Sequence, residues 1–260
     1  MGSASAQIQQ TTNIAYAKAP SANGGIWRQV GNGQWMRECA GGETGVSYNQ
    51  NVRDGHTELT VEVPFSTSLA TPELIQRVRN AWLVSNSKYP EIAIQLSTGT
   101  ELPQMMKYEK LQSDAEAIEW LQETLHIVTD QTAREVVNMT YGRRLPTKGK
   151  RNMLYLVTAP AADRMNPTRH SIVWNLGHVL ADAYSIVQFV NHFLETTTQV
   201  AGDYDLTLRD VDYSGVAGRL PVTPVDPYHK QYKPTGEQIQ EALSDAVRQA
   251  ELYASNVCKL

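Results

Sequence analysis

The chain has 260 residues, of which 41% are hydrophobic and 19% are charged, a composition typical of a globular protein and too apolar for a disordered one. Its 27 acidic and 23 basic residues are spread along the chain and give a net charge of −4, which argues against nucleic acid as a partner. No apolar run approaches the roughly 18 residues of a membrane span and no secretion signal is present, so we expect a soluble cytoplasmic protein without a membrane partner.

The N-terminal part predicts an arm, a hairpin and a strand. Residues 1–22 are rich in Ala, Ser, Gln and Thr and are expected to form a flexible arm before a single domain at 23–260. Within residues 26–36 the turn Gly31-Asn32-Gly33 separates two Trp-bearing segments, which predicts a short hairpin. In residues 57–65 polar and apolar side chains alternate, which predicts an apolar strand.

Helices and weaker strands are predicted in the middle of the chain. Thr71-Pro72 is typical of a helix start, and apolar residues recur at helical spacing until Pro90. Residues 91–96 and 104–110 read as strands. A capping box, Ser-x-x-Glu, begins a second helix over residues 113–125, with a further helical stretch to about residue 137.

The most strand-like segments are residues 152–158 and 171–176, which are expected to lie centrally in a sheet. A helix over 182–194 follows the second strand. Prolines are dense in residues 219–234, which predicts an extended crossing segment before a last helix over 236–255. The alternation indicates an α/β fold with a mixed β-sheet flanked by helices.

The chemistry concentrates in the segment GHVLADAYS, where His178 leaves a strand and precedes a helix. A rigid strand holds such a histidine while its ring faces solvent or substrate, which is where a general base belongs. Asp182, four residues later, either pairs with an arginine or caps the helix start.

Other common sites are not indicated. Cys39 and Cys258 are far apart, match no metal-ligand spacing and are expected to be free thiols. No Gly-x-Ser-x-Gly elbow, His-Glu-x-x-His helix or dinucleotide glycine pattern occurs, so hydrolase, metalloprotease and dehydrogenase functions lose their usual support.

The run WNLGHVLADAYSIVQFVNHFL, with His-x-x-x-Asp at a strand end, resembles the active-site motif of the chloramphenicol acetyltransferase-like superfamily. This superfamily includes plant-type alcohol acyltransferases, peptide-synthetase condensation domains and fungal acetyltransferases of secondary metabolism. The fungal group is the most similar in the residue pattern of this segment. The resemblance implies that His178 is the general base of acyl transfer from a coenzyme A thioester to a hydroxyl of a small-molecule acceptor. It implies a structural salt bridge for Asp182, and no bound cofactor.

The chain departs from the family pattern at several points. Ala183 stands where the family usually has Gly, and Gly177 stands where condensation domains carry a second histidine, which argues against amide formation. The second family motif, of the Asp-Phe-Gly-Trp-Gly type, is missing. The resemblance therefore covers residues 25–255, as the N-terminal, His-bearing half of the full architecture.

Three interpretations follow. The chain forms a homo-oligomer whose sites lie between subunits, or it works with a separate chain that completes the site. Alternatively, it is a truncated, repurposed member of the fold that acts as a base-assisted cyclase or as a non-catalytic binding partner.

Further residues are candidates with simpler alternatives. Trp174, Asn175, Tyr184 and Ser185 are candidate substrate-binding residues, or else core and helix-capping residues. Basic residues at 143–151 either bind coenzyme A phosphates or form a solvated loop: Arg143, Arg144, Lys148, Lys150 and Arg151. The terminal Cys258-Lys259-Leu260 resembles a peroxisomal address, which would change the expected location if Leu260 is the natural end.

Overall fold

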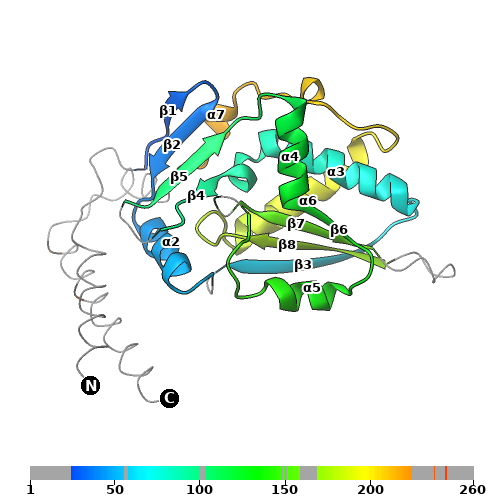
Figure 1. Ribbon diagram of the computed structural model, residues 1–260, viewed down its shortest axis with the longest axis horizontal. Coiled ribbons are helices and arrows are strands. Elements are labelled where there is room, and N and C mark those ends of the chain that lie inside the picture. Colours follow the sequence, from blue (N-terminus) through cyan, green and yellow to red (C-terminus); the bar gives the residue numbers. More distant parts are fainter. Residues whose placement is uncertain are drawn as a thin grey trace, which may run out of the picture.

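The computed structural model describes residues 25–55, 58–99, 103–147, 149, 151–158, 169–223, 237 and 244. The predicted arm, most of the Pro-rich crossing segment, nearly all of the last predicted helix and the terminal tripeptide lie outside these residues. Among the described residues the chain forms two four-stranded sheets with helices packed around them (Figure 1).

The larger sheet is mixed, as predicted. Its order is β3 (Leu59–Ser66), β8 (Arg169–Leu176), β7 (Met153–Val157) and β6 (Leu125–Val128), and only the β6–β7 pair is parallel. The two apolar strands β7 and β8 lie at the centre, which confirms their prediction. Pro64 in β3 fits an edge strand, because it has no N–H to offer a second neighbour.

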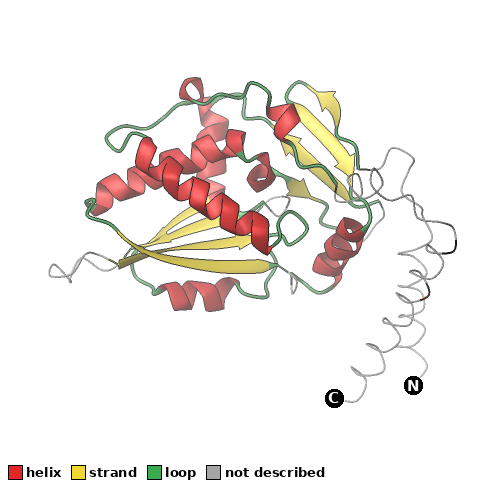
Figure 2. Ribbon diagram, turned by 180° about the vertical axis from the view of Figure 1, so that it is seen from behind, coloured by secondary structure: helices red, strands yellow, loops and turns green. Residues whose placement is uncertain are grey.

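Helices cover both faces of this sheet (Figure 2). One face packs against α3 (Thr71–Lys88), α4 (Asp114–Thr124) and α6 (Ala183–Gln199), and the other against α5 (Ala133–Thr140). Trp82 is the centre of the first layer: its ring stacks on Trp120 at 5.6 Å and meets Phe193 edge-on. The Trp82 indole N–H donates to the Thr124 hydroxyl at 2.9 Å, so this fully buried residue leaves no polar atom unpaired.

The smaller sheet is antiparallel, in the order β1 (Arg28–Gly31), β2 (Gln34–Glu38), β5 (Met105–Glu109) and β4 (Gln95–Leu96). It contains the predicted hairpin and the predicted strand at 104–110. The helix α2 (Gly42–Val52) follows β2 and was not predicted. Its buried residues are polar, namely Glu43, Ser47, Gln50 and Asn51, so the helix has no apolar stripe for a sequence pattern to reveal.

Two predicted elements are wrong. Residues 91–96 form a 3-10 helix, η1 (Pro90–Ala93), and only the two-residue strand β4, because Pro90 favours a turn and places Ile92 and Ala93 in the core. The helix does not continue from residue 125 towards 137. Residues 125–128 form β6 instead, whose pairing with β7 overrides the local pattern, and a capping box at Thr132 then starts α5.

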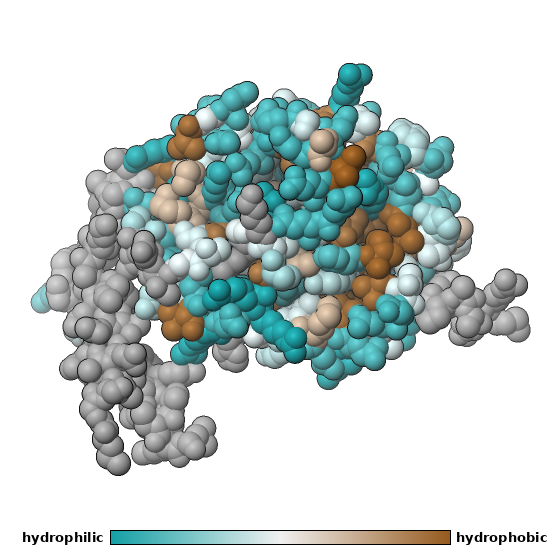
Figure 3. Space-filling view, viewed as in Figure 1, coloured by the Kyte–Doolittle hydropathy of each residue, from teal (hydrophilic) through white to brown (hydrophobic). Residues whose placement is uncertain are grey.

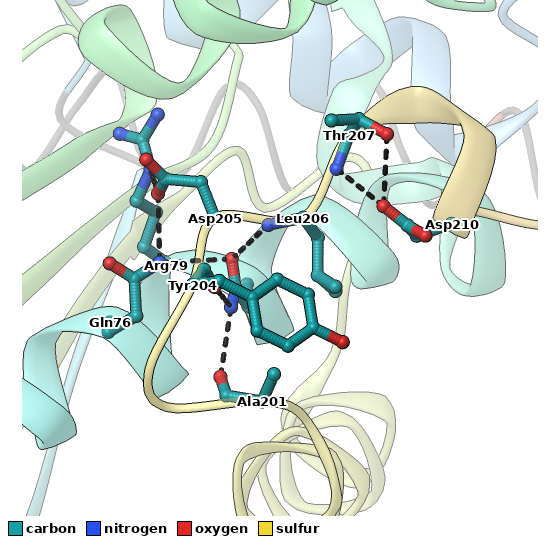
Figure 4. Close-up of polar contacts among 9 residues, drawn as sticks. Gln76, Arg79, Ala201, Tyr204, Asp205, Leu206, Thr207 and Asp210 are labelled. Atoms are coloured by element: carbon teal, nitrogen blue, oxygen red, sulfur yellow. Dashed lines mark hydrogen bonds and ion pairs between the residues drawn. The ribbon is translucent and has the colours of Figure 1, made fainter.

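A buried asparagine fastens the segment after α6 to α3. The Asn80 side-chain amide donates to the carbonyls of Ala201 at 2.9 Å and Tyr204 at 2.8 Å, and its oxygen accepts from the Leu206 N–H at 3.1 Å. Asp205 in the same segment binds Arg79 at 2.9 Å (Figure 4). The short elements η3 (Leu208–Asp210) and α7 (Val216–Arg219) complete the described fold.

The surface is mostly hydrophilic on the face drawn in Figure 3, where apolar side chains form separate patches. Within the described ranges no helix is both long and apolar enough to cross a membrane. Cys39 is a free, buried thiol, and burial raises its pKa to about 12. The other cysteine lies outside the described residues.

Candidate functional site

The loop between β8 and α6 carries the predicted catalytic histidine. It lies where the two sheets meet, beside α2 and β4 (Figures 1 and 2). The Gly177 N–H donates to Asn152 Oδ1 at 3.1 Å, and the Gly177 carbonyl accepts from the Leu180 N–H at 2.9 Å. A buried strand end and a tight turn therefore hold His178, whose side chain is exposed.

One contact orients the imidazole of His178. Its Nδ1 lies 3.1 Å from the Ala181 carbonyl oxygen. Because a carbonyl oxygen can only accept, Nδ1 is the donor in this contact, and in the neutral ring the lone pair is then on Nε2. The ring is thus in the tautomer that a general base acting through Nε2 requires.

Asp182 is the N-cap of α6. Its carboxylate accepts from the Ser185 N–H at 2.8 Å, while its own N–H donates to the Ser185 hydroxyl at 2.9 Å. The Ser185 backbone N–H is the main reason that the pKa of Asp182 lies below its usual range. The structure shows the capping alternative. Asp182 has no cationic partner among the residues whose placement is described, so the implied salt bridge stays a prediction.

Trp174 and Asn175 are core residues of β8. Trp174 packs on Phe189 with ring centroids 4.2 Å apart, and the Asn175 amide donates to the Leu59 carbonyl and the Thr60 hydroxyl. Successive strand residues point to opposite faces of a sheet, so these two side chains do not meet in one pocket.

Tyr184 and Ser185 occupy the first turn of α6. Tyr184 is 74% exposed and close in sequence to His178, whereas the Ser185 hydroxyl is engaged in the cap. The structure therefore brings His178, Asp182 and Ser185 together in one loop and helix start, and leaves Tyr184 on the adjoining surface.

Two neighbours of the loop were missed by sequence reasoning, and both come from distant segments. Asn152 precedes β7 and binds the Gly177 backbone, and Gln50 of α2 lies against Gly177, with its Nε2 3.6 Å from where a Cβ on that glycine would stand. No local pattern links residues so far apart in sequence to the His178 motif.

Two of the five basic residues at 143–151 form ion pairs. Arg144 pairs with Asp54 at 3.2 Å and Arg151 with Glu123 at 2.7 Å, and the two lysines lie outside the described residues. Across the described ranges no three His, Cys, Asp or Glu side chains converge to hold a metal ion.

Comparison with known proteins gives relatives along most of the chain. No protein-family model matches it. The acyl-CoA-dependent acyltransferase MAC1 of Pseudozyma antarctica (strain T-34) is 32% identical over 249 residues, covering 87% of this chain and 44% of the relative. MAC1 of Mycosarcoma maydis is 33% identical over 83% of this chain and 40% of its own length. The chain thus spans less than half the length of these curated relatives.

A solved structure has the same fold. The trichothecene 15-O-acetyltransferase TRI3 from Fusarium sporotrichioides superposes with a TM-score of 0.62 at 20% identity, over 77% of this chain and 42% of that one. The sequence likeness to acyl-CoA-dependent acyltransferases and this shared fold, which has a mixed sheet flanked by helices, agree with the resemblance drawn from the His178 segment. The chain belongs to the chloramphenicol acetyltransferase-like superfamily.

Proposed function

We propose that this chain carries the base-bearing part of an acyltransferase, which moves an acyl group from a coenzyme A thioester to a hydroxyl of a small-molecule acceptor. The observation that carries the proposal is His178, which is exposed at the end of a buried strand and has Nε2 free to accept a proton. The similarity to an acyl-CoA-dependent acyltransferase, MAC1, and to a trichothecene O-acetyltransferase, TRI3, supports the reaction class.

The proposed reaction needs no covalent enzyme intermediate. His178 Nε2 takes the proton of the acceptor hydroxyl as its oxygen attacks the thioester carbonyl carbon. The tetrahedral intermediate collapses, the C–S bond breaks, and the leaving thiolate takes the proton back from Nε2. Through this cycle the Ala181 carbonyl accepts a hydrogen bond from Nδ1–H and stabilises the imidazolium.

Asp182 has a positioning role in this proposal. Asp182 lies four residues after His178, and by capping α6 it fixes Ala183 as the first residue of the helix. Tyr184, exposed beside the loop, is proposed to line the acceptor site, whereas the buried Trp174 and the engaged Ser185 support the loop from within.

The site is proposed to be completed by further protein. The chain spans less than half of the MAC1 relatives, and His178 faces outward, so a second copy, a separate chain or further residues of a longer protein would supply the opposite wall. A secondary metabolite is the proposed acceptor class, by analogy with the trichothecene named for the TRI3 relative from Trichoderma arundinaceum, which is 25% identical over 71% of this chain.

The test is acyl transfer from acetyl coenzyme A to a panel of small alcohols that includes a trichothecene alcohol. Released coenzyme A and acylated product are measured by chromatography and mass spectrometry. We expect His178→Ala to lower kcat by at least about 100-fold, as loss of a general base does. His192→Ala is the matched control, because His192 is also an exposed histidine, on α6, and it is expected to keep full activity.

Two results would overturn the proposal. One is full activity of a well-folded His178→Ala variant. The other is an absence of transfer together with an absence of coenzyme A binding when the protein that completes the site is also present, which would favour a repurposed binding protein or cyclase. Solution mass, measured in parallel, reports whether the active species is an oligomer.

A further inference from the structure

Gln50 is a buried amide without a partner. Its side chain is fully buried in α2, and neither its nitrogen nor its oxygen makes a hydrogen bond with the part of the chain that the structure describes. An unpaired buried amide costs free energy, and such a group in a native fold calls for an explanation.

The other polar residues on the buried face of α2 are paired. Glu43 binds Arg37 through both carboxylate oxygens, at 2.6 Å and 2.7 Å. The Ser47 hydroxyl donates to Gln104 at 3.0 Å, and the Asn51 amide donates to the Gly99 carbonyl at 2.7 Å. Gln50 is the exception on a face that is otherwise well satisfied, so the polarity of the face does not itself account for Gln50.

Gln50 lies beneath the loop between β8 and α6, which carries His178. Its Nε2 would be 3.6 Å from a Cβ on Gly177, the residue before His178, and Leu96 of β4 packs on the same spot at 3.2 Å. The backbone of Gly177 does not satisfy the amide: its N–H donates to Asn152, and its carbonyl accepts from Leu180 and not from Gln50. The amide of Gln50 thus has an unused hydrogen-bond donor near Gly177, the residue before the proposed general base His178.

We propose that Gln50 is a further catalytic residue of this site, which donates a hydrogen bond from Nε2 to the carbonyl oxygen of the acyl thioester as that oxygen becomes negatively charged. The inference rests on the proposed acyl transfer. The Gln50 side chain is fully buried in the free chain, so in this proposal the loop at Gly177 shifts when the thioester binds and the amide reaches the carbonyl oxygen. No atom is exchanged: the amide keeps its proton and stabilises the tetrahedral intermediate.

The distinguishing variant is Gln50→Met, which has nearly the same length and shape but no hydrogen-bonding group. If the amide serves the substrate, this variant folds with an unchanged or higher Tm, because an unpaired buried group has been removed. Its kcat falls by about 100-fold or more, as loss of one oxyanion donor does, while its KM for acetyl coenzyme A changes little.

Two further variants separate the explanations. Gln50→Glu keeps one oxygen and replaces the amide nitrogen, the donor, by a second oxygen, and it is expected to be as slow as Gln50→Met. Ser85→Ala removes another buried, unpartnered polar group, in α3, and is expected to keep full activity.

The outcomes are distinguishable. Full kcat for Gln50→Met or Gln50→Glu overturns the role of Gln50 and leaves acyl transfer intact, provided that His178→Ala is inactive. A Gln50→Met chain that does not fold, or whose Tm falls while its activity per folded molecule is unchanged, also overturns it. If the unaltered chain transfers no acyl group even with the protein that completes the site, the proposed function fails, and the role of Gln50 fails with it.

Discussion

The role of Asp182 can be tested by comparing two substitutions. Asp182→Ala removes the oxygen that accepts the Ser185 N–H, whereas Asp182→Asn keeps an oxygen at that position. Asn and Asp are about equally good N-caps, and replacement of a cap by Ala costs about 1 kcal/mol. Asp182→Ala should therefore lower the free energy of unfolding by about 1 kcal/mol, and Asp182→Asn should leave it almost unchanged.

Urea denaturation followed by tryptophan fluorescence measures this difference, with thermal unfolding as a second readout. A change of about 1 kcal/mol corresponds to a Tm shift of about 2–4 °C in a chain of this size. If acyl transfer is confirmed, the two variants should order in activity as they order in stability, because the cap sets where α6 begins relative to His178.

The pH dependence provides a further check. The folded pKa of Asp182 is below the unfolded value, so its stabilising contribution is present above the unfolded pKa, about 3.9, and is lost as pH falls through the folded pKa. Asp182→Asn cannot titrate and should lose less stability than the unaltered chain in this acid range. The reasoning is refuted if Asp182→Asn costs as much as Asp182→Ala at neutral pH, which is the result expected of an essential ion pair.

Two other predictions concern stability and reactivity. Asn80→Leu removes the hydrogen bonds to the backbone of Ala201, Tyr204 and Leu206. At about 1 kcal/mol per hydrogen bond, the free energy of unfolding measured with denaturant should fall by about 3 kcal/mol. A loss below about 1 kcal/mol would contradict the view that Asn80 holds this segment on α3. Cys39 has a buried thiol with a pKa of about 12, so it should resist iodoacetamide at pH 8 in the folded chain and react in urea. Mass spectrometry of the labelled peptide measures this difference. Rapid labelling of the native chain would contradict the burial of Cys39.

Local patterns predicted the parts of the fold whose apolar residues follow a single period. The helix α3 and the central strands β7 and β8 have such patterns, and the structure places them as expected. The helix α2 could not be found in this way, because it buries polar side chains that depend on partners such as Gln104 and Arg37. The strand β6 was missed because its pairing with β7 is a tertiary effect.

The site was predicted to the extent that it is local. The passage from a buried strand through Gly177 to a helix identified His178, and the four-residue spacing identified Asp182 as a cap or an ion-pair partner. Which alternative holds depends on which cations the fold brings near, and spacing cannot reveal that. Gln50 and Asn152 reach the loop only because the two sheets meet there, so they could not be found from the motif.

The pairing of β3 with β8 has a consequence for the order of assembly. Leu59 pairs with Leu176 and Ser66 with Arg169. During synthesis β3 therefore remains unpaired until the intervening chain and β8 have been made. Contacts of such long sequence separation slow folding and leave strand edges unpaired in the meantime. A nascent chain that has emerged only through β7 therefore exposes the edges that β8 will join, and this is the stage at which we expect the protein to depend most on chaperones.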